Sequence, residues 1–335
     1  LEMMLWGKLN LTLDYYWERR KDILIQRSSL PSMAGFDASI YANMGEMDNK
    51  GVDANLEYQT RIGNKVGLRL FGNLTYSKNK IVFRDEPAMQ YAYQKSEGTR
   101  YGEFYGYIAE GYFQSEEEIK KSPRQMRELA PGDIKYKDLN DDGVIDANDQ
   151  CYLGKSWFPS WSYGMGFNIN YHNFDLALFF QGVSDVSIMA NGGSIDTGNG
   201  DWGASGVGIV PFTGMGLNPS NVITKALDRW TADNPRADAW YPRMTANATT
   251  NDNNYVNSTH WLKDGSYLRL KQASLGYTLE NKKLMDKGIE YLYFYLSGQN
   301  LLTFSKFKLW DPELGSNGAK YPLSRMVTLG MRVSF

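Results

Sequence analysis

The sequence has little of the chemistry that enzymes and metal-binding proteins commonly use. Its 335 residues include one cysteine, Cys151, and two histidines, His172 and His260. A single cysteine excludes an internal disulfide framework and a thiolate metal cluster. Two histidines far apart in the chain give little support to a zinc site or to histidine-based catalysis. The formal net charge of −2 gives no indication of a nucleic-acid partner.

Long apolar runs are also missing. No stretch approaches the roughly 18 consecutive apolar residues that a transmembrane helix requires. The chain is instead rich in aromatic residues, 14% of the total with 23 tyrosines, and it has 33 glycines. Tyrosine and tryptophan concentrate where apolar and wet surroundings meet, including both edges of a bilayer. A membrane β-barrel therefore stays open, because its strands face lipid with only every second residue.

Alternation of apolar and polar residues with a period of two predicts about eight β-strands. The last one sets Val327, Leu329 and Met331 against polar neighbours, for example. Two of the segments, 267–279 and 290–304, are aromatic or apolar on both faces, so the alternation does not assign their inward side. The eight segments are 5–18, 52–62, 66–77, 161–172, 174–180, 267–279, 290–304 and 327–335.

The connections between these strands alternate strictly between short and long. The short ones are 63–65, the turn at 172–173, and 281–287. The long ones are 19–50, 81–160, 187–265 and 305–322. Outer-membrane barrels have tight periplasmic turns and large external loops, whereas a soluble β-sandwich has no reason to sort its loops by side. We therefore predict an all-β fold, an antiparallel transmembrane β-barrel with long, partly folded extracellular loops.

Two further patterns agree with this prediction. Ser115 to Glu118 has the spacing of a helix capping box, and 222–230 before Asn234-Pro235 predicts a second helix in a loop. Aromatic residues fall where interface girdles should lie. At the short-turn ends these are Tyr171, Phe174, Tyr277, Tyr291 and Phe335, and at the long-loop ends Tyr15, Tyr16, Trp17 and Trp161.

One segment, 138–149, has the spacing of a twelve-position calcium loop, with glycine at position six. Calcium takes several oxygen ligands at once, which this density of Asp and Asn supplies. Position twelve is Asp149 rather than the bidentate Glu of an EF-hand, and a metal-free turn held by Asx hydrogen bonds is the alternative. We expect a structural Ca²⁺ site. Its candidate ligands are Asp138, Asn140, Asp142, the Val144 carbonyl, Asp146 and Asp149.

Other polar and aromatic groups give no catalytic constellation. Charges expected to face the lumen are interpreted as lining a wet interior rather than as paired catalytic carboxylates; they are Asp14, Asp53, Glu57, Arg61 and Arg69. Loop aromatics either stack on sugar rings or form the packing core of a folded loop, and the sequence does not choose between these roles; they are Trp157, Trp202, Trp240, Tyr241, Trp261 and Trp310.

Several motifs in order resemble the SusC/RagA class of TonB-dependent transporters of the Bacteroidetes. They are Pro131-Gly132-Asp133-Ile134-Lys135-Tyr136, Leu227-Asp228-Arg229-Trp230-Thr231, Asp264-Gly265-Ser266-Tyr267-Leu268-Arg269-Leu270-Lys271, Gly298-Gln299-Asn300-Leu301-Leu302 and Asp311-Pro312-Glu313. Asp141 departs from the family pattern, in which a glycine is expected before the second Asp, here Asp142. The terminal Phe335, with apolar residues at alternate positions before it, resembles the signal read by the barrel-insertion machinery.

The resemblance implies a barrel of about 22 strands, with residues 1–335 as its C-terminal portion and the plug domain and N-terminal strands absent. It also implies energy from the TonB complex, a SusD-like surface lipoprotein as partner, and oligosaccharides or sometimes peptides as cargo. We expect a non-enzymatic importer embedded in outer-membrane lipid, and a fragment, since no signal peptide is seen. Two alternatives are a small closed barrel acting as adhesin or anchor, and a barrel enzyme, for which no clustered nucleophile, His and acid is found.

Overall fold

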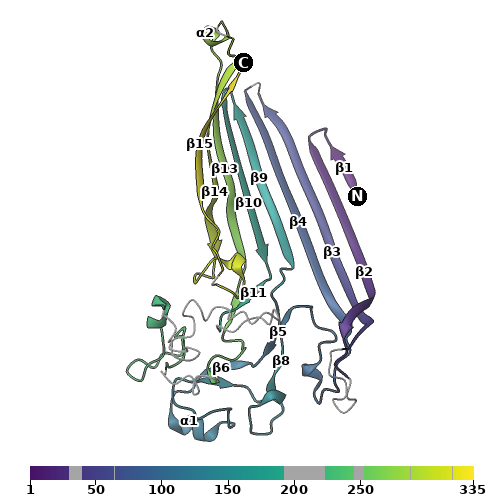
Figure 1. Cartoon of the computed structure of the whole chain (residues 1–335), viewed down its shortest axis with the longest axis vertical. Coiled ribbons are helices and arrows are strands. Elements are labelled where there is room, and N and C mark those ends of the chain that lie inside the picture. The colour runs from purple at the N-terminus through teal and green to yellow at the C-terminus, as the bar shows by residue number, and fades with distance from the viewer. Residues whose placement is uncertain (30–39, 64, 192–222, 245–252, 287, 319) are drawn as a thin grey trace.

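A computed structural model describes residues 1–29, 40–63, 65–191, 223–244, 253–286, 288–318 and 320–335. In this part of the chain a tall antiparallel sheet joins a smaller folded region at its long-loop edge, which we call the cap (Figure 1). No helix among the described residues is long and apolar enough to cross a membrane.

Nine strands form the sheet in the order in which they occur in the sequence, and every neighbouring pair is antiparallel. The predicted antiparallel all-β fold is confirmed. The strands are β1 (Glu2–Leu5), β2 (Leu9–Gln26), β3 (Tyr41–Ile62), β4 (Val66–Phe83), β9 (Trp161–Tyr171), β10 (Phe174–Ser184), β13 (Tyr267–Leu279), β14 (Tyr291–Ser305) and β15 (Met326–Ser334).

The count of eight strands and the length of the first loop were wrong. A tight turn at Trp6 and Gly7, with φ of 53° and 62°, makes β1 a separate strand. Most of the predicted loop 19–50 is strand, because β2 and β3 stay paired from Leu9 and Tyr58 to Gln26 and Tyr41. The extension of β2 begins with the consecutive charged residues 18–22, which interrupt the alternation, and apolar residues return only at Ile23, so cross-strand hydrogen bonding rather than periodicity extends the ladder.

The register sorts side chains into an apolar face and a polar face. One cross-strand row on the apolar face consists of Leu68, Ile169, Leu176, Leu275, Leu296 and Leu329. Several of these are strongly exposed, with Leu329 at 81%. Such a face is stable only against lipid, since large exposed apolar patches are rare on soluble proteins. The adjacent row on the polar face is Arg69, Asn168, Ala177, Ser274, Ser297 and Thr328.

The structure assigns the two strands whose faces the sequence left open. In β13, Ala273 pairs with Leu178 and belongs to the apolar face, whereas Ser274 pairs with Ala177 on the polar face. A register shift between Leu270 and Gln272 reverses the parity of the strand at that point. This β-bulge explains why no single alternation ran through the segment.

Two aromatic rows bound the apolar face. Tyr171, Phe174 and Tyr277 lie side by side at the short-turn edge, and Tyr15, Tyr76 and Trp161 lie in one row at the other. At about 3.3 Å per residue and a tilt of about 40°, the stretch of β4 from Val66 to Tyr76 spans roughly 25 Å, the height of a membrane apolar band. Tyr16 and Tyr291 were wrongly placed in the girdles, since their register positions fall on the polar face.

The sheet is open rather than closed. Among the described residues no pairing joins β1 to β15, and Figure 1 shows these strands at opposite edges of a curved wall. An eight-stranded closed barrel, the basis of the adhesin alternative, is therefore not the structure of this chain.

The cap contains three small two-stranded sheets and short helices. The first predicted helix is confirmed as α1 (Glu116–Lys121), where Ser115 Oγ accepts from the Glu118 amide at 3.2 Å. The sheets are β5 (Glu103–Gly106) with β8 (Cys151–Ser156), β6 (Ala109–Tyr112) with β7 (Ile134–Tyr136), and β11 (Ser187–Met189) with β12 (Leu262–Asp264). The other helical turns are η2 (Ala92–Gln94), η3 (Ala147–Asp149), η5 (Thr224–Leu227), η7 (Pro312–Leu314) and α2 (Lys282–Met285), the last at a short turn.

The second predicted helix, 222–230, was wrong. Its described residues form only the single turn η5, and position 222 lies outside the described residues. The Trp230 amide instead donates to the Tyr241 carbonyl at 2.9 Å, and the Tyr241 amide to the Asp228 carbonyl at 3.0 Å. Tertiary pairing therefore replaces the helical bonds that the local pattern favoured.

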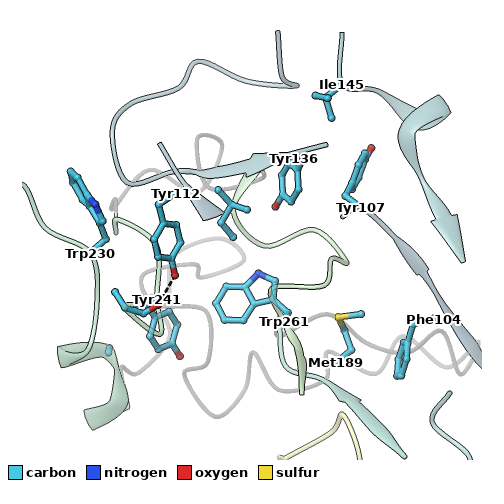
Figure 2. Packing of buried hydrophobic residues seen from close by; sticks show 12 residues of the cluster. Phe104, Tyr107, Tyr112, Tyr136, Ile145, Met189, Trp230, Tyr241 and Trp261 are labelled. Atoms are coloured by element: carbon cyan, nitrogen blue, oxygen red, sulfur yellow. Dashed lines mark hydrogen bonds between the residues drawn. The ribbon is translucent and has the colours of Figure 1, made fainter. Parts of the chain in front are cut away.

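Aromatic side chains form the core of the cap (Figure 2). Tyr241 and Trp261 are fully buried, and Trp240 packs against both. The Tyr112 hydroxyl donates to the Ala239 carbonyl at 2.8 Å, which satisfies the polar end of a buried ring. Among the candidate loop aromatics, Trp240, Tyr241 and Trp261 are therefore packing residues. Trp202 lies outside the described residues.

The face assignment predicts that the same substitution destabilises the protein by different amounts at two alanines. Ala273→Arg places a charge on the apolar face near mid-height and should cost about 2–4 kcal/mol, whereas Ala177→Arg on the polar face should cost less than about 1 kcal/mol. Thermal unfolding of the full-length protein in lipid nanodiscs measures both variants. Equal losses would show that the two faces are not in different solvents.

Candidate functional site

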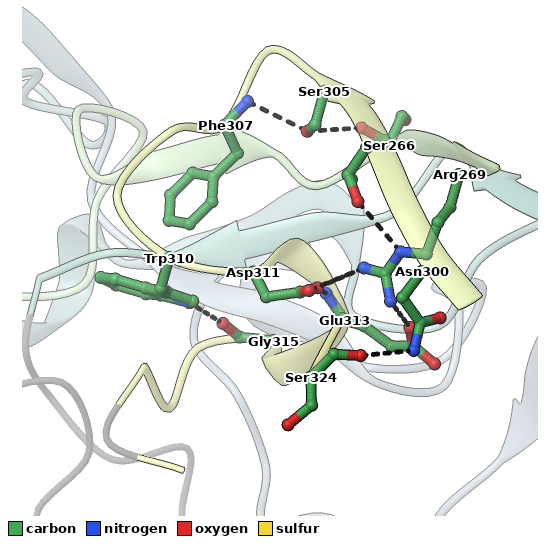
Figure 3. A network of polar contacts seen from close by, with 11 residues as sticks. Ser266, Arg269, Asn300, Ser305, Phe307, Trp310, Asp311, Glu313, Gly315 and Ser324 are labelled. Carbon is green, nitrogen blue, oxygen red and sulfur yellow. Dashed lines mark hydrogen bonds and ion pairs between the residues drawn. The ribbon is translucent and has the colours of Figure 1, made fainter. Parts of the chain in front are cut away.

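A buried arginine joins the barrel wall to the loop that follows β14. Arg269 lies on the polar face of β13 with its side chain 1% exposed. Its Nη2 donates to Asp311 at 2.6 and 2.8 Å, its Nη1 to Glu313 at 2.8 Å, and its Nε to Thr303 Oγ1 on β14 at 3.1 Å (Figure 3). Each of the three guanidinium nitrogens therefore has its own partner residue, which the planar five-donor group allows.

The local sequence explains why both carboxylates meet this arginine. Asp311 caps the turn η7 by accepting from the Glu313 amide at 3.0 Å, with Pro312 at the first helical position. The capped turn orients the side chains of Asp311 and Glu313 toward the same arginine. The motif that contains Arg269 and the motif Asp311-Pro312-Glu313 are far apart in the sequence. They contact each other in this network, which we call the clamp.

A second buried carboxylate organises the cap. Asp133 is 1% exposed and contacts Arg243, with Nε 2.6 Å from Oδ1. The same carboxylate accepts from Asn254 Nδ2 at 2.8 Å and from the Ala130 amide at 2.9 Å. A buried charge is tolerated only when it is paired and fully hydrogen-bonded, as here. Asp133 therefore ties three loop segments together.

Side-chain amides extend this network along β7. Gln125 accepts from the Tyr136 amide at 2.7 Å and donates to the Ile134 carbonyl at 2.9 Å, as a neighbouring strand would. Asn253 also donates to the Ile134 carbonyl, at 3.0 Å. Sequence reasoning missed Gln125, Arg243 and the two asparagines, because isolated polar residues in long loops carry no periodic signal.

The calcium-like loop is folded around its predicted ligands. Asp138 Oδ2 accepts from the Gly143 amide at 2.8 Å, and Gly143 has the positive φ of 81° that this turn needs. Asp138 Oδ1 is buried and has no hydrogen-bond partner among the described residues. The Asn140 and Asp142 side chains accept from the amides two residues ahead, at 3.1 and 2.9 Å, as Asx turns do.

The second half of the loop is anchored to the cap. The Arg124 amide donates to the Gly143 carbonyl and the Ile145 amide to the Arg124 carbonyl, which leaves the Val144 carbonyl outside this bridge. Ile145 is buried in the cap core. The Asp146 side chain caps the turn η3.

The Asp149 side chain joins the two ends of the loop 138–149. It is fully buried, and its two oxygens accept from the Leu139 and Asp146 amides at 2.8 Å each. Among the residues that the structure describes, no three His, Cys, Asp or Glu side chains converge as a metal-binding group. Oxygen donors of the other kinds, the Asn140 amide and the Val144 carbonyl, complete the candidate set.

The remaining candidate charges lie on the polar face of the sheet. Glu57 forms a two-point ion pair with Arg69, at 2.9 and 3.0 Å, on the polar face. Asp14 and Asp53 are cross-strand neighbours on the same face. Arg61 and Arg69 line a cleft of about 670 Å³ with Asn168, Asn170 and His172 near the short turns.

Burial shifts the pKa values of three titratable groups of the cap, and it lowers that of Lys263 to about 8. Burial lowers the pKa of His260 to about 4, so this imidazole is neutral at pH 7, with Nε2 3.2 Å from the Trp240 carbonyl. Burial raises the pKa of the Cys151 thiol, which disfavours the nucleophilic thiolate. Neither His260 nor Cys151 therefore offers an acid, a base or a nucleophile.

A second cleft lies within the cap. It has a volume of about 650 Å³ and combines aromatic rings with polar side chains. Aromatic faces and side-chain amides together are the groups that bind polar organic ligands such as sugars. Its lining includes Phe104, Tyr105, Trp157 and Tyr255, together with Glu103, Gln150 and Asn257.

A sheet with one lipid-facing and one polar side, tight turns at one edge and a folded cap at the other is the wall of a transmembrane β-barrel. The sequence resembles that of TonB-dependent receptors over almost its whole length. It is 27% identical to TonB-dependent receptor P3 of Formosa agariphila and 22% identical to SusC of Bacteroides thetaiotaomicron, in each case over 98% of this chain. No protein-family model matches the chain.

Solved structures agree on the fold. The RagAB peptide transporter matches with a TM-score of 0.72 at 23% identity, and the RagAB importer in its open-open state with 0.70 at 22%. Both matches cover 98% of this chain and 33% of the other. The chain spans about a third of the length of the receptors that it resembles. It has the fold of part of a SusC/RagA-type TonB-dependent barrel.

Removing the clamp arginine should loosen the loop after β14. Arg269→Gln leaves Asp311 largely buried without its counter-ion, at a cost of roughly 3 kcal/mol, the low end for buried pairs because Glu313 is half exposed. Limited proteolysis of the full-length protein should then cut faster within 306–318. Lys271→Gln removes the same charge two residues away and should leave the rate unchanged; equal sensitivity would contradict the clamp.

Proposed function

We propose that this chain forms part of the wall and external rim of a TonB-dependent importer of large nutrients in the outer membrane. The observation that carries the proposal is the division of one sheet between lipid and water. The apolar rows face the bilayer, while the polar face, with its paired charges and a cleft of about 670 Å³, lines a wet interior. Transport would then be gated passage along this face, with no chemical step.

The cleft within the cap supports oligosaccharides as the cargo class. Tyr105, Trp157 and Tyr255 offer ring faces for stacking on sugars, and Gln150 and Asn257 offer amides for hydroxyl groups. Peptides are the second candidate, favoured by the likeness to a RagAB peptide transporter. Both cargoes require a rim that is folded in advance, which the Asp133 and Arg269 networks supply.

The partners follow from the resemblance. A SusD-like surface lipoprotein would dock on the external side as a lid, and the TonB complex would supply energy through parts of the protein outside this chain. The cap is the region available for the lid, because it stands at the long-loop edge beyond the membrane band (Figure 1).

Uptake by intact cells tests the proposal. Deleting the gene that carries this chain should abolish uptake of one member of a panel of fluorescent oligosaccharides and peptides. An uncoupler of the inner-membrane proton gradient should abolish the same uptake in the parent strain. Unchanged uptake of every compound after deletion, or recovery of the folded protein as a monomer without detergent, would refute it.

We propose in addition that the loop 138–149 holds a structural Ca²⁺ ion. The buried, unbonded Asp138 Oδ1 supports this, because a buried carboxylate oxygen without a donor is costly unless a cation satisfies it. Asn140, Asp142, the Val144 carbonyl and Asp146 would complete the ligands, with Asp149 holding the loop ends together. The ion would stiffen the connection between β7 and β8.

Chelation should therefore lower the thermal stability of the full-length protein, and added Ca²⁺ should restore it. A ligand at 100 times its Kd stabilises by about 2.7 kcal/mol. Asp142→Ala should abolish the response, whereas Asp141→Asn, which removes the same charge beside it and suits the φ of 59°, should keep it. A parent protein that binds no metal and melts unchanged with chelator would contradict the site.

A further inference from the structure

Basic residues gather on the apolar side of the sheet just beyond its aromatic girdle at the long-loop edge. The register of β2, β3 and β4 arranges them in two cross-strand rows that continue the face carrying Tyr15 and Tyr76. The nearer row is Trp17, Lys50 and Lys78, and the next is Arg19, Asp48 and Lys80.

Three of these cations form no contact ion pair, although Asp48, which Arg19 already pairs, attracts Lys50 and Lys80 at longer range. Arg19 is neutralised by Asp48 through two hydrogen bonds of 2.6 and 2.9 Å. Lys50, Lys78 and Lys80 are exposed and form no ion pair with any carboxylate in the described part of the chain. Lys50 and Lys78 stand directly opposite each other. Like charges in that position repel, so the arrangement favours binding of an anion from outside.

The depth of the lysines identifies the surroundings of that anion. The nearer row lies two residues beyond Tyr15, roughly 5 Å higher along the membrane normal, and the next row roughly 10 Å higher. The nearer row therefore lies in the layer of lipid headgroups, which extends about 5–8 Å outside the hydrocarbon, and the next row lies at the outer boundary of that layer. Lys50 Nζ lies 5.1 Å from the Trp17 ring centre, so an ammonium group and an interfacial indole adjoin.

We propose that Lys50, Lys78 and Lys80 form a binding site for the phosphate groups of a glycolipid in the outer leaflet of the outer membrane. Ammonium groups form charge-assisted hydrogen bonds to phosphate oxygens, and the neighbouring apolar rows accommodate the acyl chains. The site would anchor this sector of the wall at a fixed depth. The proposal rests on the outer-membrane placement proposed above but on no particular cargo.

Binding of purified lipid A to the full-length protein in neutral detergent tests the site. Replacing Lys50, Lys78 and Lys80 together by Gln should weaken binding about 100-fold at about 0.1 M salt, since each basic residue at a membrane surface contributes about 5-fold. The control replaces Lys8, Lys65 and Lys282, exposed lysines at the short-turn edge, by Gln and should bind as the parent does.

Two further probes separate the sources of phosphate. Dephosphorylated lipid A should bind the parent as weakly as lipid A binds the triple variant, and inorganic phosphate at equal concentration should not compete. Both triple variants should keep the heat-modifiable migration of a folded barrel and nutrient uptake, which distinguishes loss of the lipid site from failure of the transport proposal. Equal affinity of the parent and the Lys50/Lys78/Lys80 variant, equal loss in both triple variants, or indifference to dephosphorylation would overturn the proposal.

Discussion

The continuous hydrogen-bond ladder of the sheet is the constraint on which the rest of the structure depends. In hydrocarbon a backbone N–H or C=O has no water to bond, so each strand must be paired along the whole membrane span. The antiparallel registers meet this requirement for the strands from β3 to β14, and they also set the alternation of faces; among the described residues, β15 and most of β2 are paired on one side only. A bulge is tolerated at Leu270–Gln272, where it turns Arg269 toward the polar face and lets one strand serve both the wall and the clamp.

The cap is stabilised by different interactions from those of the sheet. Its segments are too polar and too irregular to be held by strand pairing alone, and its stability comes from buried aromatic rings and a few fully bonded charges. Asp133 and Arg269 are such charges, each buried and each paired with a partly buried partner, Arg243 or Asp311, from a segment distant in sequence. A charge placed in this way is costly to leave unpaired, so it favours one arrangement of the loops over others. This is how a rim can present a defined cleft without regular secondary structure.

Membrane and rim meet at the level of Tyr15, Tyr76 and Trp161. Below this row the side chains on the lipid-facing side are mostly apolar, and above it the same face carries Lys50, Lys78 and Lys80. The change from apolar to basic side chains takes place within two residues along the strand, because the membrane interface is thin. The polar face shows no such change, because it is wet along its whole height, with Glu57 and Arg69 paired far below the rim.

The sequence by itself determined the class of fold, the sorting of turns and loops, the lipid-facing residues of β9, β10 and β15, and the helix α1. These follow from period-two alternation and local capping, which are properties of neighbouring residues. The resemblance identified the motifs, although it did not show that Arg269 and Asp311 meet. Only the tertiary structure decided the faces of β13, the extension of β2 and β3, the packing role of Tyr241 and Trp261, and the loss of the helix at 222–230. Each of these depends on partners more than ten residues away, and local periodicity carries no information about such contacts.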